Sequence, residues 1–165
     1  MAALSAGRAA PEFTLEKMDG GKFNLREALS RGPVLAVFFK ISCPVCQFAL
    51  PYVERLHKAY AGKKISIVAV SQNSKEDTAK FMREYKLTLP VLLDDIGSYP
   101  VSNAYGLTNV PTFFWIEGDG EIGLSSVGWS RADVEQINRR LAEAGQAEPA
   151  AIFSPGENVP DFRAG

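Results

Sequence analysis

Two cysteines, Cys43 and Cys46, lie three residues apart and are the only cysteines of the chain. A pair of thiols at this spacing can exchange with a disulfide, because one sulfur can attack and a neighbouring sulfur can then close the bond. Residues 34–39, just before the pair, are continuously apolar, which is typical of a strand buried on both faces. Residues 47–60, just after it, carry apolar side chains at helical spacing. The pair is therefore expected where a central strand turns into a helix.

This position favours chemistry at the first sulfur. The first N–H groups of a helix have no intrahelical partner and carry partial positive charge. A thiolate at Cys43 would be stabilised by them, whereas Cys46, about one turn into the helix, would stay more protonated. Pro44 suits the first helical turn, because its missing N–H would have been unpaired there.

Other roles for the pair fit the sequence less well. Inert core cysteines are an alternative, but random placement rarely puts this spacing at a strand-to-helix junction. A closed zinc site needs four ligands, and the chain offers no further cysteine and a single histidine, His57, eleven residues on. A permanent disulfide over so short a loop would constrain the unfolded chain least. The sequence thus predicts a reversible redox pair, with no metal and no cofactor beyond the Cys43–Cys46 disulfide.

Length and composition exclude several classes. At 165 residues the chain is expected to form one domain with a proper core. A net charge of −1 and the lack of a basic stripe argue against nucleic acid binding. The chain contains no run of eighteen apolar residues, so no transmembrane helix is expected. Residues 1–8 lack the apolar core of a signal peptide, which predicts a cytoplasmic protein, although an exported chain whose signal had been removed would look the same.

The remaining pattern predicts an α/β fold with a central mixed sheet flanked by helices. Expected first is a β-hairpin over residues 10–25; the further expected strands are 34–39, 64–71, 91–94, 113–117 and 121–127, and the expected helices are 44–61, 75–86, 98–105 and 131–145. The domain is expected to cover residues 1–145, with residues 1–10 frayed. Residues 146–165 contain three prolines and no period, which predicts an irregular tail partly docked through Ile152, Phe153 and Phe162.

Several of these motifs together resemble a known family. They are the stretch Ala10-Pro11-Glu12-Phe13-Thr14-Leu15, the apolar strand into Cys43-Pro44-Val45-Cys46, Pro51 five residues later, Tyr105-Gly106 with Asn109-Val110-Pro111-Thr112-Phe113, and Gly118-Asp119-Gly120-Glu121-Ile122. In this order they resemble the redoxin branch of the thioredoxin superfamily, which is related to AhpC/TSA. That branch includes TlpA- and ResA-type thiol–disulfide oxidoreductases and the peroxiredoxins. The resemblance covers roughly residues 9–145.

The resemblance implies a thioredoxin-like fold with the N-terminal β-hairpin as an extension. It also implies that Cys43 attacks, that Cys46 resolves, and that the peptide bond between Val110 and Pro111 is cis and set against the cysteines. Substrate contacts would come from the residues around these two motifs, namely Pro44, Val45, Val110, Pro111 and Thr112.

The chain also departs from the family pattern. Ser42 replaces the usual tryptophan, and Val37 and Ala49 stand where relatives keep carboxylates that handle protons. Another group, or water, must then take the proton of Cys46, and Asp94, Asp95 and Glu117 are the candidates. Lys40, where a small residue is common, either stabilises the Cys43 thiolate by its charge or is a solvated surface lysine.

These observations predict a thiol–disulfide oxidoreductase that exchanges disulfides with protein partners, as a monomer, and draws electrons from an unidentified donor. The two uncharged residues between the cysteines favour a reductant. One alternative is a thiol peroxidase, whose Pro-x-x-x-Thr/Ser-x-x-Cys motif is missing here because Ala36 and Lys40 hold its first two positions. Another is a redox-switched binding module, favoured only by the proline-rich tail.

Overall fold

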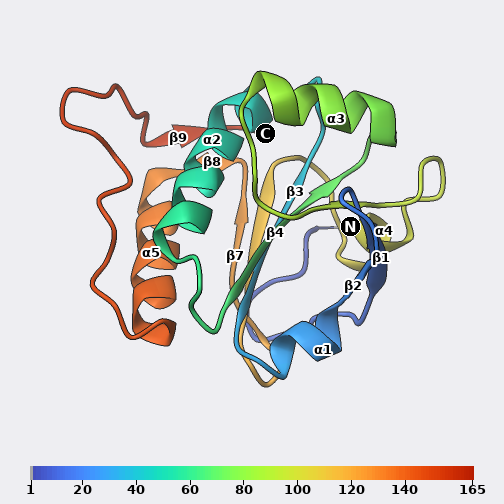
Figure 1. Cartoon of the computed structure of the whole chain (residues 1–165), viewed down its shortest axis with the longest axis horizontal. Coiled ribbons are helices and arrows are strands. Elements are labelled where there is room, and N and C mark those ends of the chain that lie inside the picture. The colour runs from blue at the N-terminus through green and yellow to red at the C-terminus, as the bar shows by residue number, and fades with distance from the viewer. Residues whose placement is uncertain (1) are drawn as a thin grey trace.

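The computed structural model describes residues 2–165, and its centre is a seven-stranded mixed sheet in the order β2-β1-β5-β4-β3-β6-β7 (Figure 1). The strands are β1 (Thr14–Lys17), β2 (Lys22–Asn24), β3 (Val34–Phe39), β4 (Ser66–Ser71), β5 (Val91–Leu93), β6 (Thr112–Ile116) and β7 (Ile122–Val127). The helices are α1 (Leu25–Leu29), α2 (Pro44–Ala59), α3 (Lys75–Glu84), α4 (Pro100–Ala104) and α5 (Arg131–Ala144). A second, two-stranded sheet joins β8 (Trp129–Ser130) to β9 (Phe162–Arg163).

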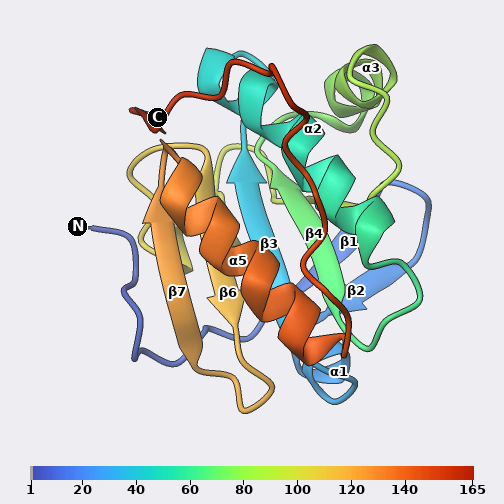
Figure 2. The ribbon, with the colours of Figure 1, turned by 90° about the vertical axis from the view of Figure 1, so that its left-hand side faces the viewer.

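Strand β3 is fully buried because both faces of the sheet are covered. Its odd-numbered residues, Leu35, Val37 and Phe39, pack in the core under α2 and α5. Its even-numbered residues pack in a second core with side chains of α1 and α4. Figure 2 shows α2 and α5 side by side across the first of these faces. The continuous apolar run is thus explained, and the predicted mixed sheet flanked by helices is confirmed.

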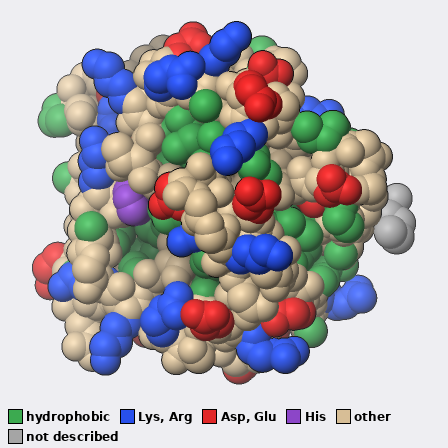
Figure 3. Space-filling view, turned by 45° about the vertical axis from the view of Figure 1, so that its right-hand side comes forward, with side chains coloured by type: hydrophobic (Ala, Val, Ile, Leu, Met, Phe, Trp, Pro, Cys, Tyr) green, Lys and Arg blue, Asp and Glu red, His purple; other side chains and the backbone are tan. Residues whose placement is uncertain are grey.

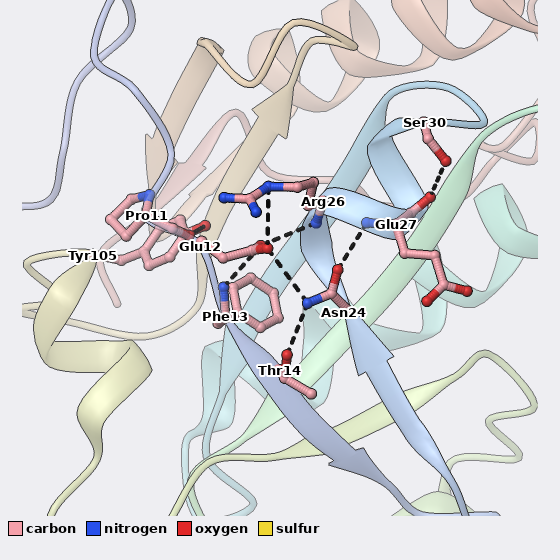
Figure 4. A network of polar contacts seen from close by, with 9 residues as sticks. All are labelled: Pro11, Glu12, Phe13, Thr14, Asn24, Arg26, Glu27, Ser30 and Tyr105. Atoms are coloured by element: carbon pink, nitrogen blue, oxygen red, sulfur yellow. Dashed lines mark hydrogen bonds and ion pairs between the residues drawn. The ribbon is translucent and has the colours of Figure 1, made fainter.

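The N-terminal hairpin is also confirmed, since β1 pairs with β2 and extends the sheet through β5. A network centred on Glu12 fixes it to α1 (Figure 4). The Glu12 carboxylate accepts the N–H of Phe13 at 3.1 Å and the N–H of Arg26 at 3.0 Å. Asn24 caps α1 by accepting the N–H of Glu27 at 2.8 Å. The stretch around Glu12, which carried part of the resemblance, therefore connects the hairpin to α1 and lies away from the cysteines.

The segment before the hairpin makes backbone hydrogen bonds to the body of the domain, which the prediction of a frayed start did not include. The Leu4 N–H donates to the carbonyl of Tyr105 at 3.0 Å, and the Ala10 N–H donates to that of Gly120 at 2.9 Å. An isolated bridge joins Ala9 to Glu121. These bonds give the backbone partners that a free terminus lacks. The first residue, which the prediction also covered, lies outside the described residues.

The tail docks more fully than expected, and its last part is a strand. Ile152 is buried as predicted, and Phe153 packs beside Trp129. Phe162 is 62% exposed, so it is not an anchor. Instead β9 pairs antiparallel with β8, which the proline-rich composition did not indicate. Figure 2 shows the tail running from the end of α5 over α2 to the edge of the sheet where α2 begins.

Two further features bear on earlier expectations. His57 is half-buried in the last turns of α2 and borders an apolar hollow with Tyr60 and Ile65, where Figure 3 shows the histidine in purple. Within residues 2–165, none of the helices combines the length and the apolar composition that a membrane crossing requires.

A buried carboxylate, Glu54, ties α2 to the loop before β5. The residue is only 5% exposed, and its side chain accepts the N–H and the hydroxyl of Thr88 at 2.9 and 2.6 Å. The N–H of Leu89 is the third donor, at 2.9 Å. A buried carboxylate with this many donors is satisfied, whereas its donors would be left unpaired without it.

We expect Glu54→Ala to lower the free energy of unfolding by about 2 kcal/mol or more, because two backbone N–H groups lose their acceptor. Glu54→Gln keeps one acceptor oxygen and should cost less. Urea unfolding measures both, with Glu84→Ala, at an exposed position of the neighbouring α3, as the matched control. An Ala variant at position 54 as stable as the control would contradict this role.

Candidate redox site at the start of α2

Cys43 is the N-cap of α2, so its sulfur lies at the mouth of the helix. The Cys46 N–H donates to Cys43 Sγ at 3.1 Å, and Pro44 occupies the first helical turn. This N–H has no intrahelical acceptor, and the partial positive charge of the helix start adds to it. Both effects stabilise negative charge on the Cys43 sulfur. The expected strand-to-helix junction is therefore where the structure places the pair.

The loop before β6 meets the same sulfur from the other side. Cys43 Sγ lies 3.4 Å from the carbonyl oxygen of Val110, which accepts the thiol hydrogen. The peptide bond between Val110 and Pro111 is cis, as predicted. Thr112 is fully buried, and its hydroxyl donates to the carbonyl of Asn109 at 2.7 Å. Thr112 thus holds the shape of this loop. Its buried side chain is not available to a partner, although a substrate contact was expected for it.

The two cysteines differ in burial, and burial changes the acidity of Cys46. Cys46 is fully buried, while Cys43 is half-buried, and both are free thiols. Burial is the largest cause that raises the pKa of Cys46, and a side-chain contact with Cys43 raises it further. A backbone hydrogen bond and the charge of Lys40 lower it, but by less. Cys46 therefore carries its proton at neutral pH.

The other predicted site residues are divided between the surface and the core. Lys40 is exposed, and its carbonyl oxygen accepts the Cys43 N–H at 3.3 Å. Pro44 is exposed beside Cys43, and Val110 is half-buried. Val45 is only 8% exposed and packs in the core. Its side chain therefore does not face a partner, although a substrate contact was predicted for it.

None of the three candidate carboxylates acts on Cys46. Glu117 follows the far end of β6, where it accepts from Trp115 Nε1 at 2.8 Å and pairs with Arg140. Asp94 is buried and accepts donors of α4, and Asp95 accepts the hydroxyl of Ser98. Among residues 2–165, the groups that shift the pKa of Cys46 belong to Cys43 and Lys40.

The end of the tail also reaches this site, which the sequence analysis missed. Asn109 Nδ2 donates to the carbonyl of Gly165 at 3.2 Å. A Cβ on Gly165 would clash with the carbonyl oxygen of Val110, so the two backbones are in direct contact. The Arg163 guanidinium lies 5.4 Å from the centre of the Phe48 ring. No sequence pattern predicted these contacts, because they join residues more than fifty positions apart in the chain.

A second glycine, Gly128, also lets the tail pack close to this loop. Gly128 lies between β7 and β8 with a φ of +77°, and a Cβ there would lie 2.6 Å from the carbonyl oxygen of Arg163. The tail can cross this point only because the side chain is absent. One side of the cis loop is therefore walled by residues 163–165.

No group of three or more histidine, cysteine or carboxylate side chains within residues 2–165 is arranged to hold a metal ion. What the arrangement can do is thiol chemistry. It has one accessible sulfur at a helix start, a second sulfur behind it, and a backbone edge alongside.

We expect iodoacetamide at pH 7.5 to alkylate Cys43 and to leave Cys46 unmodified, because Cys46 is buried and protonated. Mass spectrometry of the intact and digested protein measures this, and unfolding in guanidinium is the control that should expose both thiols. Equal alkylation of both thiols in the folded protein would contradict the proposed difference.

The docked tail should weaken in acid. A bidentate ion pair joins Arg55 to Glu157 at 2.8 and 2.7 Å, and this bonding, followed by the N–H of Ser154, lowers the pKa of Glu157 from 4.5 to about 2. A lowered folded-state pKa contributes stability above pH 4.5 that is lost as pH falls toward 2. We expect the urea midpoint of the wild type to exceed that of Glu157→Gln at pH 6 and the gap to narrow at pH 3. Glu148→Gln, at an exposed position of the same tail, should show no gap at either pH.

The family model described as AhpC/TSA family matches residues 6–125. The thiol-disulfide oxidoreductase ResA of Halalkalibacterium halodurans is 35% identical over 118 residues, which span 71% of this chain and 65% of that protein. The thioredoxin-like protein YneN of Bacillus subtilis is 32% identical over 138 residues, 81% of this chain and 78% of YneN.

Among solved structures, a protein from Chlorobium tepidum described as a thiol:disulfide interchange protein DsbE aligns with a TM-score of 0.74 at 26% identity. The alignment covers 86% of this chain and 99% of that one. The thioredoxin-like fold expected from the resemblance is thus confirmed. With its cysteine pair, its cis-proline loop and a family match over most of its length, this chain belongs to the AhpC/TSA family.

Proposed function

We propose that this protein is a thiol–disulfide oxidoreductase that reduces disulfides of protein partners. In the first step, the Cys43 thiolate attacks one partner sulfur; the partner S–S bond breaks, and its second sulfur leaves as a thiolate. In the second step, the Cys46 sulfur attacks Cys43 and releases the partner. The partner gains two electrons and two protons, and the enzyme is left with a Cys43–Cys46 disulfide that a separate donor must reduce.

The observation that carries the proposal is the position of one sulfur. Cys43 Sγ is held between the Cys46 N–H at 3.1 Å and the Val110 carbonyl at 3.4 Å. The first contact stabilises the attacking thiolate. The second places the cis loop next to the sulfur, and an extended partner chain can pair as an added strand does along the side of this loop that residues 163–165 leave open. Relatives named as thiol-disulfide oxidoreductases support the same activity.

Cys46 must lose its proton before the second step. Its raised pKa keeps it protonated while Cys43 attacks, so Cys43 and not Cys46 is the attacking sulfur of the first step. The carboxylates that the sequence analysis considered do not contact it, so the proton passes to water or to the partner thiolate released in the first step. The partner sulfur that leaves in the first step can therefore also accept the proton of Cys46.

We expect Cys43→Ser to abolish the reduction of insulin, and Cys46→Ser to accumulate mixed disulfides with partner proteins, because only the resolving step is lost. Turbidity of reduced insulin and non-reducing electrophoresis measure the two effects. Normal insulin reduction by both variants would refute the activity.

The direction of electron flow follows from the potential of the pair. A midpoint near that of thioredoxin, about −270 mV, is expected for a reductant, whereas a value near about −120 mV would make the protein an oxidant. Equilibration with glutathione buffers, followed by alkylation, measures it. Peroxide consumption in a stopped-flow instrument tests the peroxidase alternative, and we expect it to be as slow as that of an ordinary thiol, because Lys40 stands where that activity requires a hydroxyl.

A further inference from the structure

A cavity of about 210 Å³, lined mostly by residues with polar side chains, lies beside Val110, which contacts Cys43. Its lining includes Lys40, which follows β3, and Val110, whose carbonyl oxygen lies 3.4 Å from Cys43 Sγ. Gln72, which follows β4, and Asn103 of α4 lie on the other walls. Nothing in the proposed exchange chemistry uses this space.

The cavity presents one charge. Lys40 is its only charged lining residue, and within residues 2–165 its ammonium pairs with no carboxylate. The polar residues around it carry amide or hydroxyl groups; they are Gln72, Tyr99, Ser102, Asn103, Thr108 and Asn109. The amides of Gln72, Asn103 and Asn109 each use one N–H on Ser102, Ser98 or Gly165 and keep a second one. An unpaired cation beside such N–H groups is suited to an anion that accepts several hydrogen bonds, and a carboxylate is one.

A nearby carboxylate does not occupy this role. Asp94 is 2% exposed, and its Oδ2 accepts the N–H and the hydroxyl of Ser102 at 2.8 and 2.6 Å. The Ser102 hydroxyl in turn accepts from Gln72 Nε2 at 2.9 Å. The charge of Asp94 is thus held by donors of α4 behind the cavity wall. The same chain of bonds fixes Gln72 in that wall.

The side of the cis loop against which the tail packs is closed. Gly165 packs against the Val110 carbonyl, and Arg163 lies over the Phe48 ring. A partner chain that reaches Cys43 must therefore extend away from residues 163–165. The cavity with Lys40 lies open beside the same loop.

We propose that this cavity binds the side-chain carboxylate of an aspartate or glutamate close to the reactive cysteine of the partner polypeptide, with Lys40 as the pairing cation. This inference rests on the proposed disulfide exchange and names the class of substrate. Val110 lines the cavity and its carbonyl oxygen lies 3.4 Å from Cys43 Sγ, and an extended chain rises about 3.3 Å per residue, so we place the acidic residue within two positions of the cysteine.

The test uses synthetic peptides in which one cysteine forms a mixed disulfide with 2-mercaptoethanol. Glutamate, or the isosteric glutamine, stands at each of the two positions on either side. At one position we expect kcat/KM of the reduced wild type to be about three-fold higher for glutamate in low salt, the range of an exposed ion pair. The preference should shrink toward one in 0.5 M NaCl, where exposed charges are screened.

Lys40→Met should bring the glutamate-to-glutamine ratio to one, and Lys40→Glu should take it below one. The ratio compares two substrates of one variant, so a change in sulfur reactivity that affects both peptides cancels. Lys80→Met, at an exposed position on α3, is the matched control and should keep the wild-type ratio.

Three results overturn the inference, and one of them separates it from the proposed function. If the wild type reduces the glutamine peptides but shows no preference for glutamate, the carboxylate site is refuted and the exchange activity stands. If it reduces none of the peptides, both fail. If dependence on Lys40 is seen with oxidised glutathione and not with the peptides, the cavity binds a small-molecule carboxylate and the polypeptide assignment is wrong.

Discussion

One sulfur held between a helix start and a backbone carbonyl is the constraint on which the rest of this structure depends. Strand β3 delivers Cys43 to the start of α2, and β6 begins directly after Pro111. The antiparallel pairing of β3 with β6, in which Phe38 lies opposite Thr112, brings these two chain segments together. All six residues of β3 are buried, so packing on both faces of the sheet holds this strand between β4 and β6.

A single helical turn makes the two thiols chemically different. Cys43 caps the helix and is half-buried, whereas Cys46 points into the core beside Leu50 and Ala49. Burial penalises a charged sulfur, and the start of the helix favours one. The same three-residue spacing therefore separates an attacking sulfur from one that stays protonated until it is needed. No carboxylate is required to create this difference.

The surroundings of the pair come from distant parts of the chain. Residues 163–165 close one side of the cis loop, and they are held there by the pairing of β9 with β8 and by the ion pair between Arg55 and Glu157 farther back. Residues after β3 and β4 and residues of α4 line the polar cavity beside the same loop. The surface proposed to bind a partner is thus built from several parts of the chain. The redoxin motifs contribute only the sulfur and the cis loop to it.

The sequence by itself determined the central strand, the helix that follows it and the cysteine pair, because each is encoded by neighbouring residues whose apolar period or spacing can be seen locally. The cis-proline loop followed from the resemblance of residues 109–113 to the redoxin family. Only the tertiary structure decided that residues 163–165 pack on Val110, that Val45 and Thr112 are buried, and that Asp94, Asp95 and Glu117 do not reach Cys46. These outcomes depend on which backbones meet across the fold. A contact between a glycine and a carbonyl more than fifty residues apart leaves no periodic signal in the sequence.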